Sequence, residues 1–290
     1  MKLLRSVALS VLFPESRYDA SAFEQALAFL SAWPLDSVEF FFEGQDKPRV
    51  ARALAASGLN SIYIAVIPLK GQNLSLCSPD EQERQKALAL VRQCSDDARL
   101  FGCQGIMVNS GRHPGKDLAD KALSQFSLSV ESLQDDLHLS GRPMKLLLEP
   151  CDSSMDARNL LGPNRLATAL TRRLRARCPD FSLTLDTAHM REEGEDFLVE
   201  LKDSTDCCDH IHFANCFVAD ASDPMYGDKH VGFDYPGSAF PPEVLHCIFQ
   251  EIKIVYGDRT CRIALEILCR EPDPKSYFRK VAAQIPWFFD

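Results

Sequence analysis

The sequence predicts an α/β protein with a (β/α)8 TIM-barrel fold. Short apolar runs recur eight times along the chain, and longer stretches with apolar residues every three or four positions separate them. Strands that alternate with helices form a parallel sheet, and 290 residues provide enough chain for eight such repeats. A doubly wound sheet is the alternative, but no G-x-G-x-x-G pattern follows any of the runs, so we favour the barrel.

The first apolar run lies in the segment MKLLRSVALSVLF, which has the basic start of a secretory signal. Ser6 and Ser10 interrupt this run and no small-residue cleavage site follows, so we interpret it as a strand. The eight strands are expected at residues 6–13, 37–44, 61–68, 105–111, 145–150, 181–187, 210–215 and 262–268.

Two of the predicted helices have the clearest periodicity. Residues 79–102 and 164–178 carry apolar residues at helical spacing. Asp80 and Gly102 are suited to start and end the first of these helices, because a carboxylate accepts the free amide hydrogens of the first turn and glycine tolerates the backbone that follows the last.

One long stretch lacks helical period. It covers residues 217–242 and is rich in Gly, Pro and Asp. Loops of this length in compact domains usually serve a function or are disordered. We therefore predict a single barrel domain over residues 1–290, with a long loop after strand seven.

Composition and charge limit the classes of protein. With 46% hydrophobic and 25% charged residues, the chain is typical of a soluble globular protein without a membrane partner. A net charge of -9 argues against a nucleic-acid partner, because Lys and Arg must neutralise phosphates. Eleven cysteines, an odd number without C-x-x-C spacing, favour reduced thiols and a cytoplasmic location over disulfides or a zinc ribbon.

Four chemically active residues stand near the ends of the last four predicted strands. Side chains alternate between the two faces of a strand, and in each of these strands the apolar set occupies the other face. If the apolar sets pack on the helices, three carboxylates and one imidazole converge inside the barrel, where they would repel one another without a cation. The predicted ligands of this divalent metal ion are Glu149, Asp186, His212 and Glu266.

The ordered motifs LLLEP, LDTAHM, HIHFAN and ALEIL carry a family resemblance. Together they resemble the xylose isomerase-like barrel superfamily, which includes sugar isomerases and epimerases, inosose dehydratases, hydroxypyruvate isomerases and the endonuclease IV class. The resemblance covers essentially the whole chain, and the D-x-x-H pattern of Asp186 and His189 is its most specific part.

The resemblance implies an activity. In the ketose 3-epimerases of this superfamily, the positions matching the four predicted ligands bind one divalent metal, and those matching Glu149 and Glu266 are the acid/base pair. The position matching His189 contacts a substrate oxygen. This chain is thus expected to be an isomerase or epimerase of a small sugar or polyol, acting through an enediolate on one divalent ion. Mn²⁺ is favoured, with Co²⁺, Mg²⁺ or Zn²⁺ as alternatives.

Two departures from the family patterns concern metal and substrate. Members of the endonuclease IV class add histidines after strands two to four, whereas this chain has Asn109 where such a ligand is expected. The segment GDKHVG resembles the D-x-H of that class, so Asp228 and His230 contact substrate, bind a second metal with His189, or simply belong to a solvated loop turn. The epimerases' substrate-binding arginine is replaced by Val218.

Other candidates and alternatives remain open at this point. Glu43 faces inward by the parity of its strand and, like Asn109, is a candidate for substrate binding. If the same site removed a hydroxyl group or cleaved a 3-keto-C-glycoside, the chain would be a keto-sugar lyase. A further alternative is a non-catalytic barrel subunit, although such a subunit has no need for both Glu149 and Glu266. The identity of the sugar and the formation of a homo-oligomer are not specified.

Overall fold

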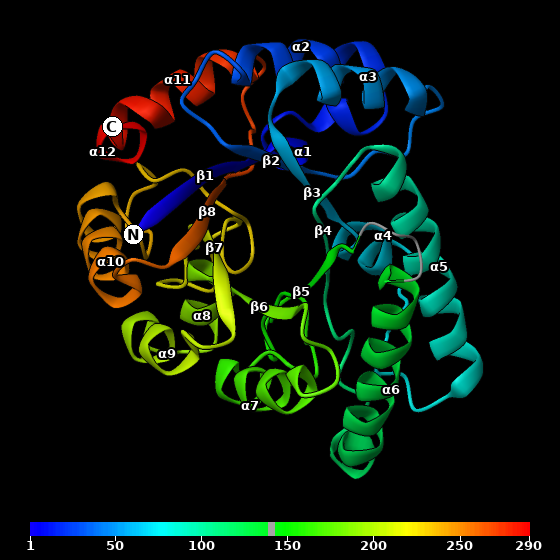
Figure 1. The fold of residues 1–290 in the computed structure, drawn as a ribbon. Helices are drawn as coiled ribbons and strands as arrows, with labels where there is room; N and C mark the ends of the chain where they lie inside the picture. Colours follow the sequence, from blue (N-terminus) through cyan, green and yellow to red (C-terminus); the bar gives the residue numbers. More distant parts are fainter. Residues whose placement is uncertain (139–142) are drawn as a thin grey trace.

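Eight parallel strands close into one barrel, and helices surround it (Figure 1). The computed structural model describes residues 1–138 and 143–290. Strands β1 and β8 pair from Lys2 opposite Thr260 to Val7 opposite Leu265, which closes the sheet. The strands are β1 (Lys2–Ala8), β2 (Ser37–Phe40), β3 (Asn60–Ile64), β4 (Gly105–Val108), β5 (Lys145–Leu148), β6 (Phe181–Asp186), β7 (Cys208–Ala214) and β8 (Thr260–Glu266). The predicted (β/α)8 fold is confirmed.

Helices fill the connections between successive strands. The larger ones are α2 (Ala20–Leu30), α3 (Lys47–Ser57), α5 (Glu81–Leu100), α6 (Ala119–His138), α7 (Asn164–Arg175), α9 (Phe197–Ser204), α10 (Pro242–Tyr256) and α11 (Pro274–Gln284). The short ones are α1 (Leu9–Leu12), α4 (Val66–Gly71), α8 (Thr187–Glu192), α12 (Pro286–Phe289) and the 3₁₀ helices η1 (Pro14–Arg17) and η2 (Lys116–Leu118). Nowhere in 1–138 or 143–290 does a helix combine the length and apolar character needed to cross a membrane.

The first strand differs from the prediction of residues 6–13. It begins at Lys2 and ends at Ala8, and the remaining apolar residues form the short buried helix α1. Ser10 in α1 explains the turn, because its hydroxyl both donates to the carbonyl oxygen of Phe41 and accepts from the Phe41 amide, each at 2.9 Å. An apolar run alone does not distinguish a buried strand from a buried helical turn. The other seven strands lie where predicted, although each ends earlier.

The predicted signals at the ends of α5 are confirmed. The Asp80 carboxylate accepts hydrogen bonds from the amides of Gln82 and Glu83, and such a cap contributes roughly 1 kcal/mol. Gly102, two residues after the helix, has a φ of +72°, which favours glycine.

The barrel interior has an apolar side and a polar side. Strands β2 to β5 are in register so that Glu39 lies beside Ile62 and Met107 lies beside Ile64 and Leu147. An apolar cluster separate from the main core forms there from Ile62, Ile64, Val66, Met107, Leu147 and Cys151. The polar side is made of buried side chains on β2, β6 and β7, namely Glu39, Thr184, Asp186, His210 and His212. Polar chemistry is therefore concentrated on one half of the interior.

Candidate active site

Four predicted metal ligands meet at the carboxyl ends of strands β5 to β8, the end at which barrel enzymes place their active sites. Asp186 pairs with His212 across β6 and β7, and Glu266 pairs with Ala214 across β7 and β8. Glu149 directly follows β5. One potential ligand atom from each of the four residues lies within 4.8 Å of those of the others. The four residues that strand alternation predicted to face inward thus lie together in the structure.

The distances among these atoms fit a bound cation. The Nδ1 atom of His212 lies 2.8 Å from Glu149 Oε1, 2.6 Å from Glu266 Oε2 and 3.6 Å from Asp186 Oδ2. No partner within the described chain forms a well-aligned hydrogen bond with His212 Nδ1, Asp186 Oδ2 or Glu266 Oε2, although all three atoms are buried. Buried polar atoms are normally satisfied, and a metal ion would satisfy these three together.

Glu39 fixes the orientation of the His212 ring. Its carboxylate lies 3.0 Å from His212 Nε2 and 2.8 Å from His210 Nε2. Burial alone would raise the pKa of Glu39, but the two histidines hold it well below the usual value, so the carboxylate is ionised. When the Nε2–H of His212 donates to Glu39, the lone pair on Nδ1 faces the other predicted ligands. Carboxylates behind metal-binding histidines commonly fix the ring in this way. Glu39 was not among the predicted site residues.

A second cluster contains His189, Asp228 and His230, and their potential ligand atoms also lie within 4.8 Å of one another. His230 Nε2 is 2.9 Å from Asp228 Oδ1, and the His189 and His230 rings meet edge to face with centroids 5.9 Å apart. Although burial alone would lower it, the pKa of His230 is raised to about 9 by the nearby Glu266 and Asp228 carboxylates. This cluster can hold a cation or hydrogen-bond to hydroxyl groups.

Asp186 connects the two clusters through its two oxygens. Oδ2 faces His212, while Oδ1 accepts a hydrogen bond of 2.9 Å from the backbone amide of His189. Asp186 is thereby the N-cap of α8, and the helical turn carries His189 from the end of β6 toward Asp228 and His230. A separation of three residues is one of the two spacings at which an N-cap side chain reaches a backbone amide, and any residue at that position can donate it.

Asp152 also lies close to His189 and Glu192 but has other partners. Its carboxylate accepts four backbone hydrogen bonds of 2.5–3.1 Å, from the amides of Ser154, Met155, Asp156 and Ala157. These bonds occupy both oxygens and shape the loop after β5. We therefore assign Asp152 to loop structure and not to metal binding.

Ion pairs tie the long loop after β7 to neighbouring loops. Lys70 in α4 lies 3.2 Å from Asp228, and the Asp228 amide donates to the Asp156 carboxylate at 2.8 Å. Lys229 also contacts Asp156, at 2.9 Å. The loop spans residues 215–241 between β7 and α10, and these contacts position Asp228 and His230 beside His189.

The two remaining predicted residues lie outside both clusters. Asn109 follows β4, is 4% exposed, and lines a small cavity together with Lys70. Glu43 is exposed and lines a different cavity among the loops after β1, β2 and β3. Glu43 differs from Glu39 because β2 ends at Phe40, so the alternation that placed both on one face no longer applies.

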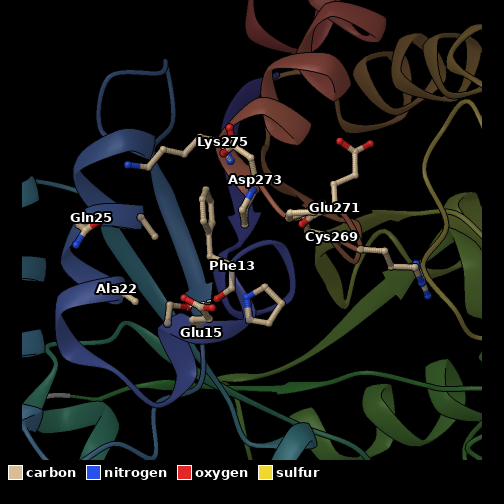
Figure 2. Close-up of a pocket in the computed structure, with 14 residues that line it drawn as sticks. Phe13, Glu15, Ala22, Gln25, Cys269, Glu271, Asp273 and Lys275 are labelled. Atoms are coloured by element: carbon tan, nitrogen blue, oxygen red, sulfur yellow. Dashed lines mark hydrogen bonds between the residues drawn. The ribbon is translucent and has the colours of Figure 1, made fainter.

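A larger cavity of about 590 Å³ lies at the edge of the barrel, where Phe13 and Glu15 face Asp273 and Lys275 (Figure 2). It is enclosed by η1, α2 and the segment leading into α11. Neither cluster contributes a residue to its lining. One lining residue, Arg270, donates a hydrogen bond to the carbonyl oxygen of Lys229, the residue before His230.

Comparison with known proteins identifies related folds. The family model of the xylose isomerase-like TIM barrel matches residues 27–254. The IolI protein with a bound zinc atom has 11% sequence identity and a TM-score of 0.72, with 100% of both chains covered. D-Allulose 3-epimerase from Methylomonas sp. in complex with D-allulose has 15% identity and a TM-score of 0.69, covering 98% of this chain and 88% of that one.

One similar structure is described as an endonuclease and not as a sugar enzyme. AP endonuclease, family 2, from Brucella melitensis has 16% identity and a TM-score of 0.67, covering 97% of this chain and 98% of the other. No curated protein matches the sequence significantly. At these identities the solved structures establish a shared fold, and the choice among activities depends on the residues of the site.

Proposed function

Because the chain belongs to the xylose isomerase-like TIM barrel family, we propose that it is a divalent-metal-dependent isomerase or epimerase of a small sugar or polyol. The observation that carries this proposal is the group of buried, unsatisfied atoms on Asp186, His212 and Glu266, which face one another beside Glu149. Two glutamates in one metal-binding group supply both the ligands and the proton-transfer groups that this chemistry needs.

The residues that would hold the ion are Glu149, Asp186, His212 and Glu266. A bound divalent ion would polarise a substrate carbonyl and stabilise negative charge on its oxygen. Mn²⁺ is our first choice, with Co²⁺, Mg²⁺ and Zn²⁺ as alternatives; carboxylate and imidazole ligands suit all of them to different degrees. The similar IolI structure contains zinc.

In this proposal Glu149 and Glu266 act on different sides of a substrate. They come from β5 and β8, and the ligands from β6 and β7 lie between them around the barrel. One glutamate removes the proton from the carbon next to the carbonyl and gives an enediolate. Return of a proton to the opposite face by the other glutamate produces an epimer, and delivery to the neighbouring carbon produces an isomer.

The cluster of His189, Asp228 and His230 would bind substrate hydroxyl groups in this proposal. The alternative is a second metal ion, and the metal content of the purified protein separates the two. One ion per chain, retained in Asp228→Asn, supports a role in substrate binding. Two ions per chain, with one lost in Asp228→Asn, would instead assign this cluster to metal.

Hydrogen exchange in D₂O tests the proposed reaction. The Mn²⁺-loaded protein is incubated with a panel of keto-sugars and inososes, and deuterium at the carbon next to the carbonyl is measured by NMR. We expect incorporation that is lost in Glu149→Gln and Glu266→Gln and retained in Glu243→Gln, a change at an exposed carboxylate of α10. A dehydrated or cleaved product would identify a lyase, and exchange that persists in both glutamine variants would remove these glutamates from proton transfer.

A further inference from the structure

A small polar cavity of about 130 Å³ lies at the carboxyl end of the barrel, next to the second cluster. Lys70 lines this cavity and also contacts Asp228 of that cluster. Clefts that enclose an entire small ligand are usually about 300–1,000 Å³, so this cavity has room for one functional group. The polar residues of its lining include Lys70, Ser75, Asn109, Arg112, Asp156 and Asn159.

Two buried amides in the lining have unsatisfied atoms. Asn109 is 4% exposed and Asn159 is 3% exposed. Within the described residues, the side-chain oxygen of Asn109 and the side-chain nitrogen of Asn159 have no hydrogen-bond partner. The Asn159 nitrogen is a donor without an acceptor, and a half-turn of the Asn109 amide would present a second donor. Buried donors of this kind are expected to have a partner.

Arg112 adds a positive charge that no acid within the described residues neutralises. Its backbone is fixed, because its amide donates to Ser75 Oγ at 3.1 Å and it forms a β-bridge with Asn159. Gly111 has a φ of +88°, and a Cβ there would lie 2.5 Å from Ser75, so glycine permits this close approach. The guanidinium group itself has no ion pair or hydrogen bond to residues 1–138 or 143–290.

The other charges around the cavity are largely balanced. Asp156 is the only acid in the lining, and Lys229 lies 2.9 Å from its carboxylate. Lys70 shares its charge with Asp228, which does not line the cavity. Arg112, which is exposed, is therefore the cation of the lining that remains free to bind a ligand. Asn109 and Asn159, each with one unsatisfied side-chain atom, line the same cavity.

We propose that this cavity binds an oxyanion, a carboxylate or a phosphate, carried by the substrate at the end remote from the metal-binding residues. Arginine suits both groups because its planar fork makes paired hydrogen bonds to them. This proposal rests on the proposed function, since it assigns the substrate class of that site: an acidic or phosphorylated sugar.

Three ketoses with the same carbon skeleton test the proposal. D-Fructose, D-fructuronate and D-fructose 6-phosphate are titrated into the purified protein by calorimetry, with and without Mn²⁺. We expect at least one anionic ketose to bind about tenfold or more tightly than D-fructose. The preferred anion distinguishes a carboxylate from a phosphate. An equal or weaker affinity for both anions, or no measurable binding of either, would overturn the proposal.

Variants connect the preference to this cavity. Arg112→Met should lower the ratio of anionic to neutral affinity about tenfold, and Asn109→Asp, which adds a carboxylate of the same shape, should also lower it. Lys116→Met is the matched control, because it removes one charge from an exposed position of the same loop outside the cavity. A ratio that survives Arg112→Met, or falls equally in Lys116→Met, would reject the site.

The outcome is separable from that of the proposed function. Anion binding that depends on Arg112 without hydrogen exchange in any keto-sugar would support the cavity and count against the enzymatic reaction. Exchange in a neutral ketose, with no preference for anions, would support the reaction and reject the cavity.

Discussion

The two halves of the barrel interior differ in chemistry although they are built from the same parallel sheet. On the side of β3 to β5, aliphatic side chains such as Ile62, Ile64 and Met107 form a separate apolar cluster. On the side of β6 to β8, buried His212 and half-buried Glu266 lie 2.6 Å apart between Nδ1 and Oε2. The apolar side packs like a hydrophobic core. The polar side contains buried charges, whose burial is costly unless a ligand or counter-ion compensates them.

This difference separates stability from activity. The aliphatic half excludes water, and it also lowers the local dielectric constant, which strengthens the interactions of the charged half. Changes in the apolar half should mainly alter the free energy of unfolding. Changes in the polar half should mainly alter metal affinity and turnover.

The largest expected effect follows from Asp186, which belongs to the polar half. Asp186→Ala removes a metal ligand and the cap of α8, so it should abolish stabilisation by Mn²⁺ in thermal unfolding. Asp186→Asn keeps a capping oxygen and should weaken Mn²⁺ binding while preserving the cap, which is typically worth about 1 kcal/mol. Equal stability of the two metal-free variants would show that the cap contributes nothing.

The apolar half gives the next largest effect. Ile64 is 4% exposed, and Ile64→Ala should lower the free energy of unfolding by about 2–5 kcal/mol through lost contacts and a cavity. Chemical denaturation measures this change, and Mn²⁺ stoichiometry should stay the same. Leu128→Ala on α6 is the control, since Leu128 is 52% exposed and its truncation should cost little. Loss of metal in Ile64→Ala would break the division between the halves.

Glu39 tests whether the polar half extends to β2. Glu39→Gln should weaken Mn²⁺ binding about 10- to 100-fold, because the His212 ring loses its ionised partner. A metal titration of the purified variant provides the measurement. Glu43→Gln changes a carboxylate four residues away that is exposed, and it should leave the metal affinity unchanged. A change in substrate affinity in Glu43→Gln would support its predicted role in substrate binding.

The smallest expected effect is on the reactivity of the cysteine thiols, which reports whether solvent reaches the barrel interior. Cys151 lies in the apolar cluster, and burial raises its pKa to about 11, so little thiolate is present near neutral pH. Cys247 is exposed, while the other cysteines are buried. We expect one rapidly labelled thiol in the native protein with a chromogenic disulfide, and none in Cys247→Ser. Rapid labelling at Cys151 would show that solvent reaches the apolar half.

The strands and the four predicted metal ligands could be predicted because the alternation of side chains along a strand can be recognised within a single segment of sequence. Asp186 and His212 needed only their own strands to be assigned inward. Alternation along β2 also turns Glu39 inward, but its contact with His212 depends on β2 facing β7 across the barrel, and no pattern within one segment contains that information. The prediction for Glu43 relied on an alternation that stops at Phe40, where β2 ends.

The loops were less accessible to prediction from the sequence. The motif containing Asp228 and His230 suggested a ligand pair, but its contacts with Lys70 and Asp156 join three loops that are distant in the sequence. The cavity beside Arg112 likewise depends on how the loops after β3, β4 and β5 pack. These contacts are set by tertiary structure and leave no periodic signal.

The shared carboxylate of Asp186 has a consequence for dynamics. Its Oδ1 accepts the amide hydrogen of His189, while its Oδ2 faces the candidate metal position. An ion that immobilises Oδ2 would also slow the opening of that hydrogen bond, so the exchange rate of one backbone amide would report on occupancy of the centre. The amide of His189 is thus a natural spectroscopic probe, readable without a substrate.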